Sequence, residues 1–459
     1  MKKVVTAVFD IGKTNKKFFL FDKEFKEVYR EYTRFTEIKD EDGYPTENLP
    51  ALQDWLKEVF HKILESKEYK VKAINFSTYG ASLVHIDNNG NVLTPLYNYT
   101  KPMNEAYIAS FYEKYGPELK FSQETGSSNS GMLNSGMQLY WLKQEKPEIF
   151  KKIKFSLHFP QYLSYIFTGI PLSEYTSIGC HTALWDYLKK DYHKWVYNEE
   201  LHHILPPIVS TETSINMNYN GKRIKIGVGI HDSSSALLPY VRSSKKPFIL
   251  VSTGTWSISL NPFFNGILSE KDIQEGSINY MRINGKAVKS SRIFLGNFYR
   301  QNAQKLARHY RVYEDYHQTV TFDYEMYSSI IKDFKPFFNL ESSNALKVKE
   351  IDLNTLPYKC FEMAYHHLMI EIVQLQVKSI AVAKGDTEIK KLYIDGGFTA
   401  NDVYINLLSH SLRDMKLRTT TSSLGSALGA AIAISDVKLN SKFLEYNYAL
   451  QKHTPFIVS

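Results

Sequence analysis

A glycine, a lysine and a threonine occupy positions 12–14, directly after an apolar run and two residues after Asp10. This order would suit the end of a nucleotide-binding P-loop, but a P-loop has a second glycine five positions earlier, where this chain has Ala7. A P-loop also opens a helix, whereas the aromatic-rich residues 16–22 are typical of a strand. We therefore expect a strand, a tight turn and a second strand. An ordinary hairpin turn is the alternative to a phosphate site.

The same layout returns in the second half of the chain. Residues 248–260 indicate a strand, a Thr-Gly-Thr turn and another strand, and residues 391–397 indicate a strand that ends in two glycines. Exposed backbone N–H groups in such turns bind anions. Two α/β halves that each present a glycine turn toward a shared cleft therefore suggest a clamp on one polyphosphate.

Asp232 follows an apolar strand at 225–230 and precedes a helix that begins at about Ser233. Ligands of α/β proteins gather outside the carboxyl ends of strands, and a helix N-terminus keeps a nearby carboxylate ionised and attracts phosphate. Asp232 is therefore our candidate for a general base. The alternative is that its carboxylate only caps the helix, and the two roles are compatible.

The elements that position these residues alternate between strands and helices, as in an α/β protein. The expected strands are 4–9, 16–22, about 27–35, 71–78, 82–87, 225–230, 248–260 and 391–397. Helices are expected near 48–65, through most of 104–200, near 358–383, from about 401, and at 422–434. The last of these helices is rich in small residues, which allow very close packing.

The length and composition bound the class of protein. With 459 residues the chain exceeds the roughly 250–300 residues at which one core stops growing, so we expect two domains with a boundary near 240–247. The formal net charge is +8, but the lysines are spread along the chain, and no basic block of the kind that follows a phosphate backbone is present. We therefore expect no nucleic-acid partner.

Membrane and export signals are also weak. The apolar stretch 424–434 is shorter than the roughly 18 residues that suggest a membrane span, and Asp10 ends the N-terminal apolar run too early for a signal peptide. The two cysteines, Cys180 and Cys360, show no metal-binding spacing and are expected to be buried and unreactive. A cytoplasmic protein with no membrane partner fits these observations best.

Several motifs together resemble the FGGY carbohydrate kinase family, within the superfamily of sugar kinases, heat-shock ATPases and actin. The segment Asp10–Lys17 resembles the first phosphate motif of the family, and Ser252–Trp256 resembles the second. Asp395–Asn401 resembles its glycine-rich adenosine loop, and "GIHDSSSA" at 229–236 resembles the segment that holds its catalytic aspartate. The segments 168–179 and 205–209 resemble further landmarks of the first domain, so the likeness covers most of the chain.

This resemblance implies an α/β fold with two ribonuclease H-like domains of the actin and hexokinase type and an inter-domain cleft. Residues 1–243 would bind the sugar and carry the first phosphate motif and the catalytic base, and residues 244–459 would bind ATP. The implied reaction transfers the γ-phosphoryl group of ATP to a sugar hydroxyl with Mg²⁺ as cofactor. The partners are then a small sugar and ATP, with a homodimer as an open alternative to a monomer.

The resemblance also assigns roles to residues. Asp232 would be the catalytic base, and Asp10 would organise the metal ion. The residues expected to contact the nucleotide and its phosphates are Gly12, Lys13, Thr14, Asn15, Lys17, Gly254, Thr255, Gly396, Gly397 and Asn401. Those expected to contact the sugar are Gly80, Ser82, Tyr97, Asn98, His231, Asp232 and Ser233. Lys13 stands where the family has a small hydroxyl residue, and Asp395 stands where it more often has a glycine.

The sugar itself is indicated by the branch of the family that the motifs resemble. His231-Asp232-Ser233, the turn at 252–256 and the segment 77–87 are similar to the rhamnulokinase and fuculokinase branch. This implies phosphorylation of the 1-hydroxyl of a 6-deoxyketohexose, L-rhamnulose or L-fuculose, with Tyr79, Tyr97 and Tyr99 as aromatic walls. Xylulose, ribulose or a polyol is the alternative substrate. An inactive sugar sensor or an actin-like ATPase is the alternative class.

Overall fold

The computed structural model describes residues 1–338, 351–420 and 424–456, and these form two compact units. The first unit contains residues 1–244, 265–288 and 424–441, and the second contains residues 245–264, 289–423 and 442–459, apart from the residues outside the described ranges. Three separate parts of the chain therefore build the first unit. No helix among the described residues is long and apolar enough to cross a bilayer.

The first unit is built on a mixed sheet with the strand order β13-β14-β6-β1-β2-β3, and β15 also pairs with β6. Strand β1 runs antiparallel to β2, as predicted for the hairpin, and parallel to β6. The strands are β1 (Lys3–Ile11), β2 (Lys16–Phe21), β3 (Glu27–Thr33), β6 (Tyr69–Thr78), β13 (Ser214–Tyr219), β14 (Lys222–Gly227) and β15 (Ile230–His231). The carboxyl ends of β1, β6 and β15 meet at one edge, because these strands are parallel.

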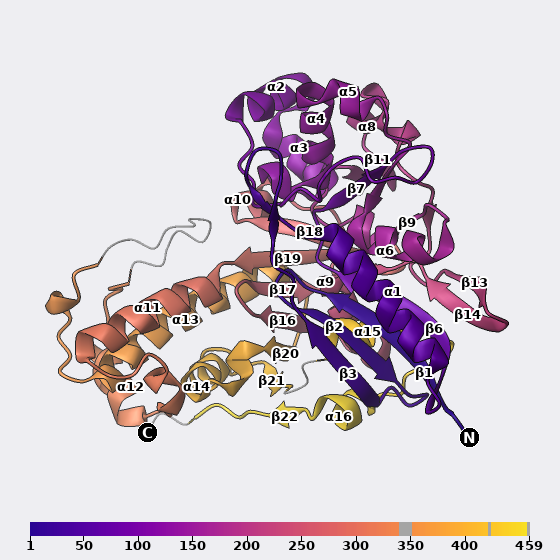
Figure 1. Ribbon diagram of the computed structural model, residues 1–459. Helices are drawn as coiled ribbons and strands as arrows, with labels where there is room; N and C mark the ends of the chain where they lie inside the picture. The colour runs from indigo at the N-terminus through magenta and orange to yellow at the C-terminus, as the bar shows by residue number, and fades with distance from the viewer. Residues whose placement is uncertain (339–350, 421–423, 457–459) are drawn as a thin grey trace. The chain divides into compact units, whose positions relative to one another are not determined.

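The two faces of this sheet are covered by different helices. Phe9 and Ile11 face a core shared with α1 (Leu49–Glu65) and α6 (Phe159–Thr168), and Figure 1 shows α1 lying across the strands. Because side chains alternate along a strand, Asp10 points to the opposite face. That face contacts α9 (Asp232–Ser243) and α15 (Gly425–Ala433).

The predicted helical region 104–200 is mostly helical and has its own core around Phe111 and Trp195. Its elements are α2 (Glu105–Tyr115), α3 (Glu118–Thr125), α4 (Ser135–Glu145), α5 (Pro147–Phe150), α7 (Tyr175–Ile178), α8 (Lys194–Asn198), and the short strands β8 (Phe155–His158), β9 (Ser173–Glu174), β10 (Trp185–Asp186) and β11 (Asp191–Tyr192). Smaller parts of the first unit are β4 (Ile38–Lys39), β5 (Pro45–Thr46), β7 (Leu83–Ile86), β12 (Ile208–Val209), α10 (Glu270–Gln274) and β18 (Ser277–Met281).

The second unit repeats the layout of the first. Strand β16 runs antiparallel to β17 and parallel to β20, in the order β19-β17-β16-β20-β21-β22. The elements are β16 (Ile249–Thr253), β17 (Ser257–Asn261), β19 (Ala287–Ile293), α11 (Leu295–Tyr310), α12 (Tyr324–Lys332), α13 (Phe361–Lys384), β20 (Lys391–Gly396), α14 (Asp402–Ser411), β21 (Lys416–Thr419), α16 (Phe443–Tyr448) and β22 (Gln451–Lys452). The duplicated strand–glycine turn–strand pattern is thus confirmed.

Element boundaries differ from the predictions by a few residues. Strand β3 ends at Thr33 rather than near residue 35, and the helix expected at 358–383 spans Phe361–Lys384. The small-residue helix begins at Gly425, and the first part of its predicted range, residues 421–423, lies outside the described residues. Local caps and solvent exposure decide such ends, and hydrophobic periodicity reports them poorly.

The close packing predicted for the small-residue helix is confirmed within the first unit. A Cβ atom built on Gly429 of α15 would lie 1.8 Å from the carbonyl oxygen of Ser235 in α9. The two backbones therefore approach too closely for any side chain at this position. Asn75 of β6 secures the contact, since its side-chain amide donates to the Ala430 carbonyl at 2.8 Å.

We expect Gly429→Ala to destabilise the first unit by about 1–3 kcal/mol, because overpacking outweighs the better helix propensity of alanine. Gly397→Ala is the matched control, since a Cβ there meets nothing within 4 Å. Urea unfolding followed by tryptophan fluorescence measures both changes. Equal stability of the two variants would contradict the tight contact between α9 and α15.

Candidate active site

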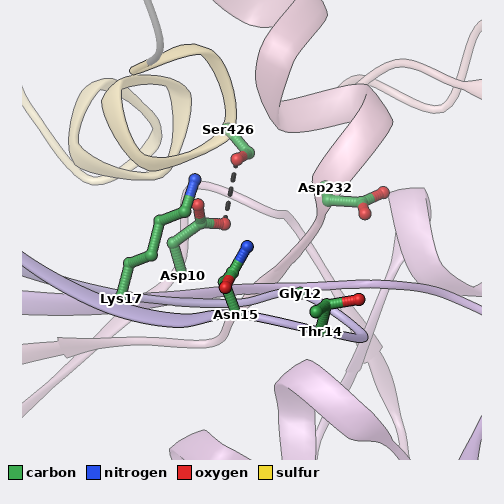
Figure 2. A pocket seen from close by; sticks show the side chains of 7 residues that line it. All are labelled: Asp10, Gly12, Thr14, Asn15, Lys17, Asp232 and Ser426. Atoms are coloured by element: carbon green, nitrogen blue, oxygen red, sulfur yellow. Dashed lines mark hydrogen bonds between the residues drawn. The ribbon is translucent and has the colours of Figure 1, made fainter. Parts of the chain in front are cut away.

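A cavity of about 230 Å³ opens at the carboxyl edge of the first sheet. Its lining comes from the end of β1, the β1–β2 turn, and the first residues of α9 and α15. The lining residues are Asp10, Gly12, Thr14, Asn15, Lys17, Asp232 and Ser426, and Figure 2 shows how they lie around it. All belong to the first unit.

Asp10 is held at the sheet face that meets α15. The Ser426 hydroxyl donates a hydrogen bond to its carboxylate at 2.9 Å, and Lys17 is its cross-strand neighbour in the hairpin. Burial raises the pKa of Asp10 to about 6, and the negative charge of Asp232 adds to this effect, whereas Lys17 opposes it. A buried carboxylate of this kind is stabilised in its ionised form by a further cation.

The β1–β2 turn is closed by a hydrogen bond from the Gly12 N–H to the Asn15 carbonyl at 3.0 Å. The Asn15 side chain accepts a hydrogen bond from Arg34 at 2.7 Å. Lys13 is absent from the cavity lining, and its ammonium group pairs with Glu37 at 3.1 Å. Of the five residues predicted for the first phosphate motif, the structure therefore brings together four and directs Lys13 elsewhere.

A buried ion pair that was not predicted from the sequence holds this turn. Lys16 lies opposite Ile11 in the hairpin and is 1 % exposed. Its ammonium group donates to the carbonyls of Gly12 and Lys13 at 3.2 Å and 3.0 Å and pairs with both carboxylate oxygens of Glu47 at 2.8 Å and 2.9 Å. The alternation of the strand was the available signal, because one of two successive lysines must face the core.

Asp232 is the first residue of α9, and the helix cap position belongs to His231, whose side chain makes no capping hydrogen bond. The Asp232 carboxylate accepts from the backbone N–H of Ser233 at 2.5 Å and from its hydroxyl at 3.2 Å. The Asp232 side chain is 36 % exposed and lines the cavity.

The loop before Asp232 is set by Gly229 and Asn75. Gly229 has a φ of +89°, and a Cβ there would lie 2.5 Å from the Pro160 carbonyl oxygen, so glycine is required. The Gly229 N–H donates to the Asn75 side chain at 3.1 Å, and Asn75 also holds α15. One buried amide therefore holds the loop before α9 and the Ala430 turn of α15 against the same strand.

Two of the predicted sugar-contacting residues lie against each other. A Cβ on Gly80 would come within 2.5 Å of His231 Nε2, so the glycine lets the imidazole approach the backbone. Burial lowers the pKa of His231 and keeps it neutral, although Asp232 opposes the shift. Ser82 is buried nearby in the chain, where its carbonyl accepts from the Phe159 N–H at 3.1 Å.

Tyr97 and Asn98 have other partners. The Tyr97 ring packs edge-on against Trp141 with centroids 5.0 Å apart, and its hydroxyl donates to Glu41. The Asn98 amide donates to the Pro45 carbonyl at 3.0 Å. The contacts the structure records for both side chains are within the protein, and neither residue lines the cavity of Figure 2.

The predicted nucleotide residues of the second unit gather where β16 and β20 end. Thr253 and Gly396 are register partners, and a Cβ on Gly396 would lie 1.9 Å from the Thr253 carbonyl oxygen. Gly254 donates its N–H to the Trp256 carbonyl at 2.9 Å, which closes the β16–β17 turn beside the exposed Thr255. The pairing of β16 with β20 thus brings Gly254 and Gly396 together.

Gly397 and Asn401 continue this loop toward α14. Asn401 is the cap of α14, where its side chain accepts from the Tyr404 N–H at 2.9 Å and donates to the Tyr365 hydroxyl at 2.7 Å. Asp395 is buried at the end of β20, and burial raises its pKa to about 6. Its backbone carbonyl accepts from the Thr253 hydroxyl at 2.6 Å, which ties the two strand ends together.

Comparison with known proteins gives the class that this fold and site define. The model of the N-terminal domain of the FGGY family of carbohydrate kinases matches residues 5–237, and that of the FGGY C-terminal domain matches residues 245–442. The chain therefore belongs to the FGGY family of carbohydrate kinases.

Among curated relatives, a rhamnulokinase of Halalkalibacterium halodurans is 27% identical over 184 residues, which cover 39% of each chain. An L-fuculokinase of Escherichia coli K12 is 24% identical over 306 residues, covering 61% of this chain and 63% of the relative. The chain thus spans about two fifths to two thirds of the curated relatives it matches.

Solved structures show the same fold over nearly the whole chain. A carbohydrate kinase from Novosphingobium aromaticivorans has a TM-score of 0.80 at 21% identity, covering 99% of this chain and 95% of that one. A xylulose kinase from Rhodospirillum rubrum has a TM-score of 0.81 at 14% identity, covering 98% and 94%. The predicted two-domain sugar kinase fold is confirmed.

Proposed function

We propose that this protein is an ATP-dependent carbohydrate kinase. The oxygen of a sugar hydroxyl attacks the γ-phosphorus of ATP, the bond from that phosphorus to the bridging oxygen breaks, and ADP leaves. The observation that carries the proposal is the cavity in which Asp10 and Asp232 face the Gly12–Asn15 turn. Positioning and charge stabilisation are what phosphoryl transfer requires of a protein.

Each carboxylate has a distinct part in this proposal. Asp232 accepts the proton of the attacking hydroxyl, because it is partly exposed and lies at a helix N-terminus. Asp10 would hold Mg²⁺. This fits its burial and its raised pKa, since a bound cation stabilises the ionised form of a buried carboxylate. When bound, Mg²⁺ neutralises charge on the β- and γ-oxygens.

Backbone groups would hold the nucleotide. The β1–β2 turn offers N–H groups to phosphate oxygens, and Lys17 and Thr14 add donors from the same cavity. In the second unit we assign nucleotide binding to Gly254, Thr255, Gly396, Gly397 and Asn401. Their location at the ends of two paired parallel strands supports this assignment.

For the sugar we propose a 6-deoxyketohexose, L-rhamnulose or L-fuculose. The rhamnulokinase and L-fuculokinase relatives support this choice. The His231 imidazole beside Gly80 and the paired rings of Tyr79 and Tyr99, 5.9 Å apart, are aromatic surfaces of the kind that suits a ligand with a methyl end. The cytoplasm, which keeps thiols reduced, suits an enzyme in which neither cysteine forms a disulfide.

A coupled assay of ADP release against ketoses and polyols tests the proposal. We expect turnover to require added sugar, and kcat/KM to be higher for L-rhamnulose or L-fuculose than for D-xylulose and glycerol. ATP hydrolysis that ignores sugar would contradict the kinase. A kcat/KM for glycerol or D-xylulose above that for both deoxyketoses would contradict only the choice of sugar.

A further inference from the structure

Three side chains with metal-binding atoms gather beside Asp232. Cys180 and His181 follow α7, and His231 ends β15. All three are buried, and one ligand atom from each lies within 4.8 Å of the other two. The cavity lining of Figure 2 does not include them, so the cluster is distinct from the phosphate-facing carboxylates.

The spacing suits a small tetrahedral ion. Cys180 Sγ and His231 Nε2 are 3.4 Å apart. With metal–sulfur and metal–nitrogen bonds of about 2.3 Å and about 2.0–2.1 Å, zinc ligands lie about 3.4–3.6 Å from each other. The Cys180–His231 pair already has this separation, and the ligand atom of His181 lies within 4.8 Å of both.

A hydrogen bond leaves the required nitrogen atom of His181 unprotonated. His181 Nδ1 lies 3.1 Å from the Leu133 carbonyl, which can only accept, so the proton is on Nδ1 and the lone pair is on Nε2. His231 Nδ1 lies 3.5 Å from an Asp232 oxygen without a hydrogen bond, and His231 Nε2 lies 3.4 Å from the Cys180 thiol. An imidazole fixed through its other nitrogen is the usual arrangement of a metal ligand.

The backbone holds this arrangement under strain. His181 has a φ of +40°, a conformation uncommon for a residue other than glycine. Its ring also packs edge-on against those of His231 and Tyr280, with centroids 6.0 Å and 5.8 Å apart. Strained residues held by their surroundings cluster at ligand sites.

We propose that Cys180, His181 and His231 bind one Zn²⁺ ion per chain and that this ion inhibits the enzyme. One thiolate and two imidazoles are ligands that favour zinc over magnesium. Binding converts the Cys180 thiol to a thiolate and releases its proton to solvent. The inhibition rests on the proposed function, because a His231 imidazole bound to zinc is withdrawn from the sugar next to Asp232. The binding of zinc itself does not depend on the proposed function.

Cobalt(II) tests the binding without reference to catalysis, because a cobalt–thiolate bond gives a near-ultraviolet charge-transfer band. Metal-free, reduced protein titrated with Co²⁺ should develop this band to one equivalent per chain. Cys180→Ser should abolish it, and Cys360→Ser should retain it, since Cys360 is the other cysteine of the chain and is partly exposed. His181→Ala, a second variant, should weaken binding at least about tenfold.

The outcomes separate the two parts of the proposal. A band that survives in Cys180→Ser, or no band in the wild type, overturns the site. With the sugar that the wild type phosphorylates, the Zn²⁺ concentration for half inhibition should rise at least about tenfold in Cys180→Ser and stay unchanged in Cys360→Ser. Equal inhibition of the wild type, Cys180→Ser and Cys360→Ser overturns the inhibitory role. If the protein shows no kinase activity, the cobalt titration alone decides whether the site binds metal.

Discussion

Replacing Asp232 by asparagine should lower kcat by about 10²–10⁴-fold, because general-base action typically contributes that much. Asparagine keeps the shape of the side chain and can still accept a hydrogen bond from the Ser233 N–H, but it cannot take a proton. The affinity for ATP should change little. Steady-state kinetics with the preferred sugar and nucleotide binding by calorimetry measure the two quantities.

Asp436→Asn is the matched control, since its carboxylate is 94% exposed and forms a surface ion pair with Lys225 at 3.3 Å. Its kinetics should equal those of the wild type. An Asp232→Asn enzyme that retains more than about a tenth of the wild-type rate would remove this residue from the role of base.

Replacing Lys16 by methionine should destabilise the first unit by about 3–5 kcal/mol, because it leaves the Glu47 carboxylate buried without a cation to pair with. Glu47 is 4% exposed, and its remaining recorded donor is the Tyr79 hydroxyl at 3.2 Å. The carbonyls of Gly12 and Lys13 would lose their donor as well. Urea unfolding followed by circular dichroism measures the change.

Two further variants test whether the loss of stability comes from the buried ion pair. Lys17→Met removes the neighbouring lysine, which lines the cavity on the other face of the strand, and should cost much less stability. The double variant Lys16→Met/Glu47→Leu should recover a large part of the loss, because no unpaired charge then remains buried. A Lys16→Met protein as stable as the wild type would show that the ion pair supports nothing.

The parts of the fold that follow from local sequence were predictable. The β1–β2 and β16–β17 hairpins, the glycine turns and the start of α9 beside Asp232 each depend on a few adjacent residues. Apolar periodicity and turn residues report such features directly. The family resemblance added the prediction that the two halves have the same type of fold. Local patterns alone indicate this only because the strand–glycine turn–strand pattern occurs twice.

The remaining parts of the site depend on contacts between distant segments. Ser426 reaches Asp10 across 416 positions of sequence, and Asn75 reaches Ala430 across 355. Lys16 and Glu47 were missed because a lysine in a hairpin is usually solvated, and its burial depends on a partner 31 residues away. Cys180 was predicted to be buried and is, whereas Cys360 is partly exposed, since it precedes α13 rather than lying within it.

Helix α15 has a consequence for how the protein is made. The first sheet is begun by residue 3, yet the helix that packs on the Asp10 face, with Gly429 against Ser235, comes from residues 425–433. The first unit therefore cannot close before a ribosome has released residues 425–433. Until then the nascent chain leaves the part of this sheet face that α15 covers exposed, which is the kind of surface that chaperones bind and that aggregates.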